Sequence, residues 1–289
     1  MGRPTNTVYM IKDRIKHFFR HRLGVFGFAV VCLWILASVL APVVSVYSPT
    51  RIDFAERFEA PSCSHPFGTD RFGRDVLTRC LWALRLSLLV ALGAVSIELL
   101  IGTSLGAMSG LIGGWVDGVI QRGLEVLMSI PVMILALVIL TIVRPGVAPL
   151  MIILGLCGWK QLCRVVRGEV LSIKENEFVM AATAIGVTNA RLVTIHILPH
   201  LIGLIFVNAT IRIGMIVLME AALSYLGFGI PPPAPTLGGM LADARDIEIL
   251  QSMPWLWVAP GAILSLLVLS VNFVGDGLRD AFDPRGSER

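Results

Sequence analysis

The stretch LGVFGFAVVCLWILASVLAPVVSV, residues 23–46, decides the fold class of this chain. No charged residue occurs between Arg22 and Arg51, and the run exceeds the roughly 20 residues that a helix needs to cross a bilayer. The run is apolar on every face, unlike the one-sided amphipathic helix of a soluble core. Of 289 residues only 15% are charged, against about 25% in soluble domains. The sequence therefore predicts an integral membrane protein.

Five more apolar runs follow the first, which predicts an all-α polytopic protein with about six transmembrane helices. A cleaved signal peptide is the competing interpretation of the first run, but its apolar region would span only about 7–15 residues. We therefore expect an uncleaved first helix and a membrane core over residues 86–274. The expected spans are Leu23–Val46, Leu86–Ile112, Gly118–Val143, Ala148–Val166, Leu201–Met219 and Leu256–Val274.

Basic residues near the spans predict the orientation. Six Lys and Arg residues lie in segment 1–22, and such residues favour the cytoplasmic side of a membrane. The N-terminus is therefore expected in the cytoplasm, and six spans place the C-terminus and segment 167–200 there as well. Segments 47–85 and 220–255 are expected outside. Segment 220–255 fits, because Arg245 is its only Lys or Arg, whereas the arginines of segment 47–85 oppose the rule and are partly balanced by acids.

Both external segments contain features beyond simple loops. In residues 65–85, several leucines and Val76 recur at helical spacing, which predicts a helix at the outer interface before the second span. A solvated loop is the alternative. In segment 220–255, the prolines at 231–233 and 235 cannot continue a helix and favour an extended, polyproline-like chain.

Segment 167–200 contains a predicted helix–glycine–helix element. Glu177–Ile185 is expected to be a short helix with small residues such as Ala181 and Ala182, and Gly186 can end it in a left-handed conformation. A second helix is expected just after it, and Pro199 marks the start of the fifth span. Exposed small and apolar residues suit the docking of another protein, although a plain amphipathic hairpin is equally compatible.

Two ionisable residues fall in the middle of predicted spans, Glu98 in the second and Arg212 in the fifth. Charges are costly in lipid, so both side chains should face the interior of the bundle or water. Either they line a translocation path, or they are structural groups satisfied by hydrogen bonds between helices.

Two further patterns concern helix packing. Gly102, Gly106 and Gly110 repeat every four residues, a spacing that permits close approach of a second helix. Arg122 and Glu125 are three residues apart and can pair on one helix face. We interpret both patterns as structural.

Motifs for energy conversion and catalysis are missing from the sequence. None of the lysines follows a glycine, so there is no Walker-type phosphate loop. HExxH, GxSxG and CxxC motifs are also missing, and the spans offer no nucleophile–base pair for an intramembrane enzyme. We therefore expect a transport protein that is not itself an enzyme, driven by an ion gradient or by another subunit.

The sequence predicts neither a metal site nor a nucleic-acid surface. Cys63 and His65 are two metal-ligand types at a spacing that usually arises by coincidence. A disulfide between Cys63 and Cys80 is left open, because spacing alone does not support it. The basic residues form no stripe interleaved with aromatic residues, which argues against nucleic acid as a partner.

Three separated motifs resemble one family, the dipeptide/oligopeptide/nickel ABC-transporter permeases, and specifically their C-type subunit. HPFGTDRFGRD at His65–Asp75 resembles the signature that follows the first span in that family, with Phe67 in place of the usual leucine. ALSYLGFG at Ala222–Gly229, with the prolines and Gly238–Leu241 after it, resembles an external-loop signature. GDGLRDAFDPR at Gly275–Arg285 is similar to the C-terminal tail. The resemblance covers residues 65–285.

The predicted helix–glycine–helix element resembles the cytoplasmic loop through which such permeases contact their ATPases. Met180 stands where the family has a glutamate, before Ala181 and Ala182, so one charge is missing from the expected contact. The resemblance assigns ATPase coupling to the following residues: Glu177, Met180, Ala181, Ala182, Gly186, Leu198 and Pro199.

The resemblance implies a type I ABC importer permease in a bacterial cytoplasmic (inner) membrane, with both termini, including the tail 275–289, in the cytoplasm. It implies a heterodimer with a homologous permease, two ATPase subunits that use ATP and Mg, and an external solute-binding protein. The chain itself is expected to bind no cofactor. The implied cargo is a di- or oligopeptide, with nickel or a metal chelate as the alternative, and a gradient-driven secondary transporter is the rival mechanism.

Overall fold

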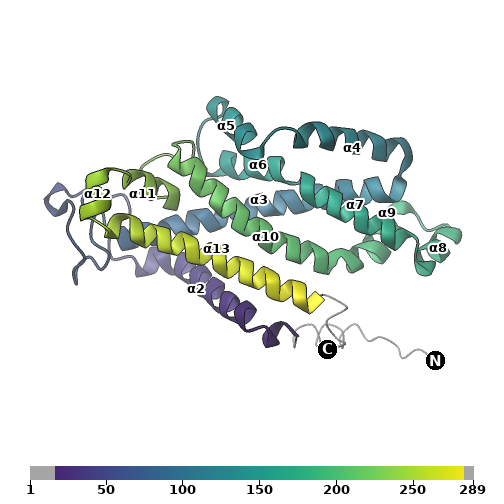
Figure 1. Cartoon of the computed structure of the whole chain (residues 1–289), viewed down its shortest axis with the longest axis horizontal. Helices are drawn as coiled ribbons and strands as arrows, with labels where there is room; N and C mark the ends of the chain where they lie inside the picture. The colour runs from purple at the N-terminus through teal and green to yellow at the C-terminus, as the bar shows by residue number, and fades with distance from the viewer. Residues whose placement is uncertain (1–16, 283–289) are drawn as a thin grey trace.

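The computed structural model describes residues 17–282, and this part of the chain contains helices and no β-strand. The long helices run side by side along the molecule, as Figure 1 shows. The helices are α2 (Arg22–Val44), α3 (Val76–Ile112), α4 (Gly114–Met128), α5 (Val132–Ile142), α6 (Val147–Gly158), α7 (Lys160–Lys174), α8 (Glu177–Ala184), α9 (Asn189–Arg191), α10 (Leu198–Tyr225), α11 (Leu237–Asp243), α12 (Ile247–Ser252) and α13 (Trp255–Phe282), with a 3₁₀ turn at Phe54–Glu56 and a π-helix at Leu192–Ile197.

The predicted six spans correspond to four long helices and two bent pairs. Among the described residues, α2, α3, α10 and α13 are long and apolar enough to cross a membrane. The pairs α4–α5 and α6–α7 reach that length only together, with bends of 81° and 41°. Pro131, which has no N–H to donate, explains the first break. Both pairs were expected as single spans, and the breaks bring polar residues to the depth of the membrane.

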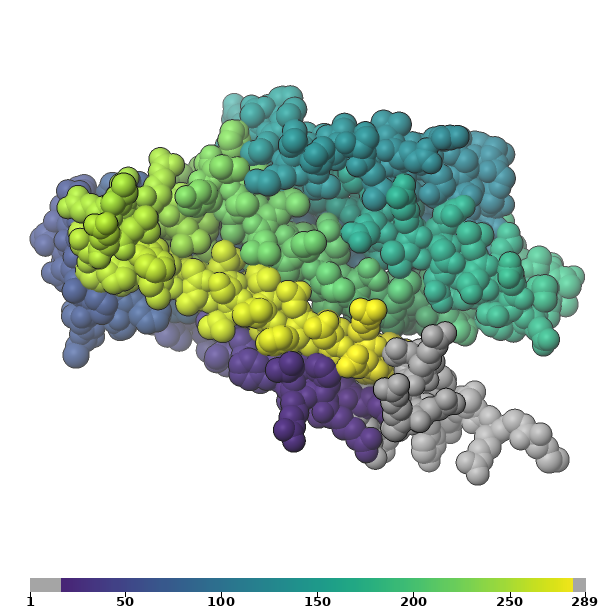
Figure 2. Space-filling view, viewed as in Figure 1, coloured from purple at the N-terminus to yellow at the C-terminus, as the bar shows by residue number. Residues whose placement is uncertain are grey.

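The two ends of the bundle differ in their elements. One end, here called the loop end, carries residues 45–75 with α11 and α12 (Figure 1). The other end, here called the hairpin end, carries α8 and α9. In the space-filling view, α2 lies along α13 at the edge of the bundle (Figure 2). Their backbones are close, because a Cβ on Gly27 would lie 2.5 Å from the carbonyl oxygen of Ser270. Most of α2 is exposed, as expected for a helix that faces lipid.

The predicted boundary at residue 85 is wrong. A single helix, α3, begins at Val76 and continues without a break to Ile112. Asp75 caps this helix, because its Oδ2 accepts a hydrogen bond from the N–H of Thr78 at 2.7 Å. The 37 residues rise about 55 Å at 1.5 Å per residue, well beyond the bilayer core. The leucines taken for a separate interfacial helix are therefore the first turns of the same helix that forms the second span.

Two other boundaries differ from the prediction. Helix α10 runs to Tyr225, so the start of the expected loop 220–255 is helical, and that loop contains α11 and α12. The prolines at 232–233 form a turn in place of the expected extended chain. Helix α13 continues to Phe282, beyond the expected end at residue 274. The rest of the predicted tail, residues 283–289, lies outside the described residues, as does most of segment 1–22.

The glycine repeat of α3 packs against α7, which confirms the prediction of close helix contact. A Cβ on Gly106 would lie 2.6 Å from the carbonyl oxygen of Cys163, and one on Gly110 would lie 2.9 Å from the side chain of Val170. Gly102 meets the carbonyl oxygen of Trp159 in the same way, at 2.9 Å. The repeat therefore fixes α7, which leads into the hairpin end, tightly along α3.

The structure also bears on the predicted Arg122–Glu125 pair and on the two cysteines of the first external segment. Arg122 donates to Glu125 at 2.9 Å, which confirms the pairing on α4. Both side chains are exposed, so the pair contributes little to stability. Cys63 is exposed, Cys80 is buried, and both are free thiols.

Candidate functional sites

The hairpin end carries a compact element, here called the hairpin element, formed by residues 175–197. Helix α8 ends where Gly186 takes a φ of +82°, and the N–H of Gly186 donates to the carbonyl of Thr183 at 3.0 Å. The N–H of Val187 donates to the carbonyl of Ala182 at 3.1 Å, which completes the turn. A positive φ favours glycine, and this confirms the predicted left-handed end of the helix.

The two faces of α8 have different surroundings. Val179 and Ala182 are buried against the bundle, whereas Phe178, Met180 and Ile185 are exposed, Ile185 by 82%. Glu177 and Ala181 are exposed as well. Of the seven residues predicted to couple to an ATPase, Ala182 therefore packs inward and cannot form the docking surface itself. The exposed apolar face is the part of the element that remains open to a partner.

The second half of the hairpin element joins the fifth span directly. Residues Asn189–Tyr225 form one continuous helical stretch that includes the π-helix. Pro199 lies in the first turn of α10, and its missing N–H leaves a carbonyl of the preceding turn without its helical partner. At Leu198 and Pro199 the chain thus changes from the π-helix to α10 without an intervening loop. No loop therefore separates the second half of the hairpin element from the fifth span.

Helix α7 ties the hairpin element to the rest of the bundle. Arg167 of α7 donates two hydrogen bonds of 2.6 Å to Asp117 of α4. Lys174, at the end of α7, donates to the carbonyl oxygen of Leu111 at the end of α3, at 2.8 Å. Asp117 also accepts a hydrogen bond from Ser109 of α3. These contacts connect three helices just before the chain enters α8.

Glu98 and Arg212, predicted separately, form one ion pair between α3 and α10. Arg212 donates from Nε to Glu98 Oε2 at 2.7 Å and from Nη2 to Oε1 at 2.6 Å, a bidentate pairing. Glu98 is only 1% exposed. Gly158 of α6 lies against the pair, because a Cβ there would overlap with Glu98 Oε1. The pair joins three helices at membrane depth, and the sequence did not indicate that the two residues meet.

A cavity of about 270 Å³ lies beside this pair, at the two helix breaks. Arg212 contributes to its wall together with Lys160, which the sequence analysis did not single out. Lys160 is buried, and its Nζ donates to the carbonyl oxygen of Leu127 at 2.8 Å. Lys160 falls inside the predicted span Ala148–Val166, so a charge within an apolar run was a signal of burial here, as it was for Glu98 and Arg212.

At the loop end, the motif of residues 65–75 folds into a unit held by its own side chains. Asp70 accepts hydrogen bonds from the N–H groups of Phe72 and Arg74, and its other oxygen accepts from Arg74 Nε at 2.7 Å. Gly73 has a φ of +69°, and a Cβ there would overlap with the carbonyl oxygen of Asp53. The aspartate and the glycine of the motif are therefore explained by local structure.

Buried His65 belongs to the same unit. His65 Nδ1 lies 2.9 Å from Asp75 Oδ1, and its Nε2 lies 3.4 Å from Glu56. Asp75 is also the residue that caps α3. Across residues 17–282 there is no cluster of three or more His, Cys, Asp and Glu residues that could hold a metal ion. The contacts of His65 are therefore structural, with Asp75 and Glu56, and do not involve Cys63.

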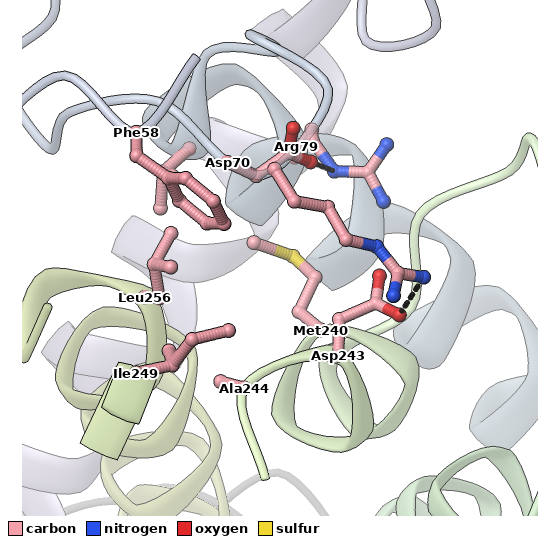
Figure 3. A pocket seen from close by; sticks show the side chains of 10 residues that line it. Phe58, Asp70, Arg79, Met240, Asp243, Ala244, Ile249 and Leu256 are labelled. Carbon is pink, nitrogen blue, oxygen red and sulfur yellow. Dashed lines mark hydrogen bonds and ion pairs between the residues drawn. The ribbon is translucent and has the colours of Figure 1, made fainter. Parts of the chain in front are cut away.

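The unit closes against α11 and α13 around a small pocket, shown in Figure 3. Apolar side chains, among them Phe58, Met240 and Leu256, gather on one side of the pocket, and Asp70, Arg79 and Asp243 lie on the other. Arg71 of the motif donates to Asp243 of α11 at 2.8 Å, which links the motif to that helix.

A larger hollow of about 590 Å³ opens beside this pocket at the loop end. Arginines of the motif line one side, and residues 224–246 line the other. Both external-loop motifs of the sequence therefore meet at one surface, which their separation of more than a hundred residues did not reveal.

Glu220 is a further buried carboxyl group that the sequence analysis placed in an external loop. It lies in α10 and is fully buried, with Ser87 of α3 donating to Oε2 and Ser224 donating to Oε1, each at 2.7 Å. The two serines satisfy the carboxyl group, and the bond from Ser87 joins α3 to α10 near the loop end. The predicted span stops at Met219, before this charged residue, whereas α10 continues to Tyr225.

Comparison with known proteins gives consistent results along the whole chain. A family model described as "Binding-protein-dependent transport system inner membrane component" matches residues 102–287. A second, described as "N-terminal TM domain of oligopeptide transport permease C", matches residues 10–61. The first includes the hairpin element and Arg212, and the second includes α2.

Similar full-length proteins cover nearly the same residues. A candidate peptide permease protein of Brucella suis biovar 1 (strain 1330) is 40% identical, over 98% of this chain and 93% of its own length. The dipeptide transport system permease protein of Alkalihalophilus pseudofirmus is 38% identical, over 95% and 90%. The oligopeptide transport system permease protein of Bacillus subtilis (strain 168) is 33% identical, over 95% and 89%.

Proposed function

The chain belongs to the family of binding-protein-dependent transport system inner membrane components, and we propose that it is the membrane subunit of an ATP-driven peptide importer. Relatives named for peptide, dipeptide and oligopeptide transport align over 95–98% of the chain, which supports a peptide cargo. The subunit provides the path and no catalytic chemistry of its own.

The hairpin element is the observation that carries this proposal. Its exposed apolar residues Phe178, Met180 and Ile185 form a surface on which an ATPase subunit docks. The element continues into α10 and is held to α3 and α4 through α7, so movement of the ATPase reaches the spans. ATP and Mg are used in the partner. With Met180 at the contact, docking relies on apolar burial more than on charge.

The remaining parts of the assembly follow from the two ends. A homologous permease completes a heterodimer around the path, and two ATPase subunits bind the hairpin ends on the cytoplasmic side. A solute-binding protein docks at the loop end, outside the inner membrane of the bacterium. Both termini are then cytoplasmic, and the basic residues at the start of the chain support that orientation.

Reconstitution of the complete transporter tests the proposal. The chain, its partner permease, the ATPases and the binding protein are placed in proteoliposomes, and uptake of radiolabelled tri-alanine and nickel is followed with and without ATP. We expect ATP-dependent uptake of tri-alanine that disappears in Gly186→Trp, while the variant still inserts and assembles with the partner permease. Uptake that needs no ATPase would contradict an ABC importer, and uptake of nickel alone would replace the peptide cargo.

A further inference from the structure

The cavity at the two helix breaks contains a positive charge without a counter-ion. Lys160 is only 5% exposed, and the hydrogen bond from its Nζ ends on a neutral group, the carbonyl oxygen of Leu127. Among the described residues no carboxylate lies within 4.0 Å of the Lys160 ammonium. The second cation, Arg212, is matched by Glu98 through two hydrogen bonds. The cavity therefore carries a net charge of about one positive unit.

Capping of a free carbonyl does not by itself account for a buried ammonium group. Lys174, on the same helix, also donates to a carbonyl, that of Leu111, at the same distance of 2.8 Å. Lys174 is exposed at the end of α7, where water completes its solvation. Lys160 lies inside a predicted span and lines the same cavity as Arg212, where an unmatched charge is costly and marks a pathway or a ligand.

The lining of the cavity suits a small anionic group. Gln161 and the partly exposed Arg212 supply further N–H donors beside Lys160. The space of about 270 Å³ is far larger than a single water molecule needs, and it is partly open, so a peptide carboxylate can enter it. The opposite wall is apolar and is formed by Met128, Ile130, Pro131 and Val132.

We propose that this cavity is a carboxylate-binding subsite of the translocation path, in which Lys160 binds the charged group of a peptide in transit. Arg212 and Gln161 orient the carboxylate, and Glu98 holds Arg212 in place from behind. Naming a peptide as the carrier of the carboxylate rests on the proposed function. The selectivity of the cavity for anions rests on the geometry alone, so the two are tested separately.

Labelling of a cysteine in the cavity tests its selectivity without reference to transport. Gln161→Cys is introduced into the assembled transporter in membrane vesicles. Its reaction rates with an anionic (sulfonatoethyl) and a cationic (trimethylammonioethyl) methanethiosulfonate are measured, with the rate of the unsubstituted chain subtracted. We expect the anion-to-cation rate ratio to fall about tenfold when Lys160→Met is added, and to be kept in Lys160→Arg. The ratio cancels any change in thiol reactivity that is common to both reagents.

The matched control is Lys174→Met, which removes the other carbonyl-bound lysine of α7 and should leave the ratio unchanged. An equal fall in Lys174→Met, or an unchanged ratio in Lys160→Met, would overturn the subsite. Failure of both reagents to react would overturn it too, because the cavity would then be closed to water and solutes.

Transport of matched peptides then tests the carrier. Uptake of tri-alanine, tri-alanine amide and Ala-Glu-Ala amide is measured with one binding protein throughout, so its own preferences are constant. In Lys160→Met we expect the acid-to-amide uptake ratio of tri-alanine to fall about tenfold. A parallel fall for Ala-Glu-Ala amide relative to tri-alanine amide extends recognition to side-chain carboxylates, and an unchanged one confines it to the C-terminus. Equal loss for all three peptides overturns the subsite, whereas no ATP-dependent uptake by the unsubstituted transporter refutes the peptide function and leaves the labelling result to decide on the cavity.

Discussion

The loop end and the hairpin end of this permease use their side chains in opposite ways. At the loop end, Asp70, Arg74 and His65 all find partners within the chain, and the motif encloses them. At the hairpin end, Ile185, directly after α8, is 82% exposed, and Phe178 stacks on His200 but remains partly exposed. The loop end encloses its polar motif within the chain, whereas the hairpin end leaves apolar side chains on the surface where the proposed ATPase docks.

The largest effect is expected at the Glu98–Arg212 pair, which extends the internal pairing of the loop end into the membrane. Glu98→Leu leaves the mostly buried guanidinium of Arg212 unpaired, so we expect a loss of about 3 kcal/mol in the free energy of unfolding, measured by denaturant titration in detergent. The double variant Glu98→Leu/Arg212→Met removes both charges and should recover most of that loss. Equal losses in the single and double variants would show that the pairing itself is unimportant.

This result would also refine the role of Glu98. The position of the residue in the sequence left a path role and a structural role open, and the geometry gives it a structural partner. If the Glu98→Leu variant folds normally and only transport fails, Glu98 acts directly in the path. Its pairing with Arg212 would then not be needed for stability.

The next effect compares two glycines of the same backbone conformation, one at each end. Gly73 and Gly186 both have positive φ, but a Cβ would meet Asp53 at the first and nothing within 4 Å at the second. Gly73→Ala should therefore lose about 3 kcal/mol, from left-handed strain and overpacking together. Gly186→Ala should lose only about 1–2 kcal/mol, from strain alone. Thermal unfolding of the two purified variants checks the order, and equal shifts would mean that the loop end is no more enclosed than the hairpin end.

A third prediction separates docking from stability at the hairpin end. Ile185→Asp places a charge on the exposed face of α8, so the ATPase subunits should co-purify about tenfold less well while the unfolding temperature of the chain stays the same. Ile247→Asp, an equally exposed isoleucine on α12 at the loop end, is the matched control and should not change ATPase recovery. Loss of ATPase recovery in both variants would place the contact elsewhere.

The sequence predicted those features that depend on a single local rule. Long apolar runs predicted the spans, because a helix needs about 20 mostly apolar residues to cross the bilayer. The turn at Gly186 was predicted because left-handed backbone favours glycine. The glycine repeat of α3 was likewise correctly interpreted as a packing surface, although its partner, α7, was unknown.

Features that depend on contacts between distant segments were not predicted. Glu98 and Arg212 were both noticed, but their pairing depends on how α3 and α10 cross. Glu220 was assigned to a loop because the predicted span ended at Met219, and the serine of α3 that satisfies its carboxyl group is distant in the sequence. The break at Trp159 has no proline to signal it. Lys160 was a visible charge inside a predicted span, but its contact with Leu127 of α4 depends on how the helices pack.

The smallest effect concerns two exposed ion pairs, and it shows how far the comparison between the ends extends to the surface. Arg71–Asp243 joins the motif to α11 across 172 residues, whereas Arg122–Glu125 joins neighbours on α4. Arg71→Met should lose at most about 1 kcal/mol, and Arg122→Met under about 0.5 kcal/mol, because exposed pairs are screened by solvent and salt. Denaturant titrations at low and high salt measure both. If Arg122→Met lost more free energy of unfolding than Arg71→Met, the Arg71–Asp243 pair would contribute less than a pair within one helix. The buried groups of the loop end would then hold it closed without help from its surface.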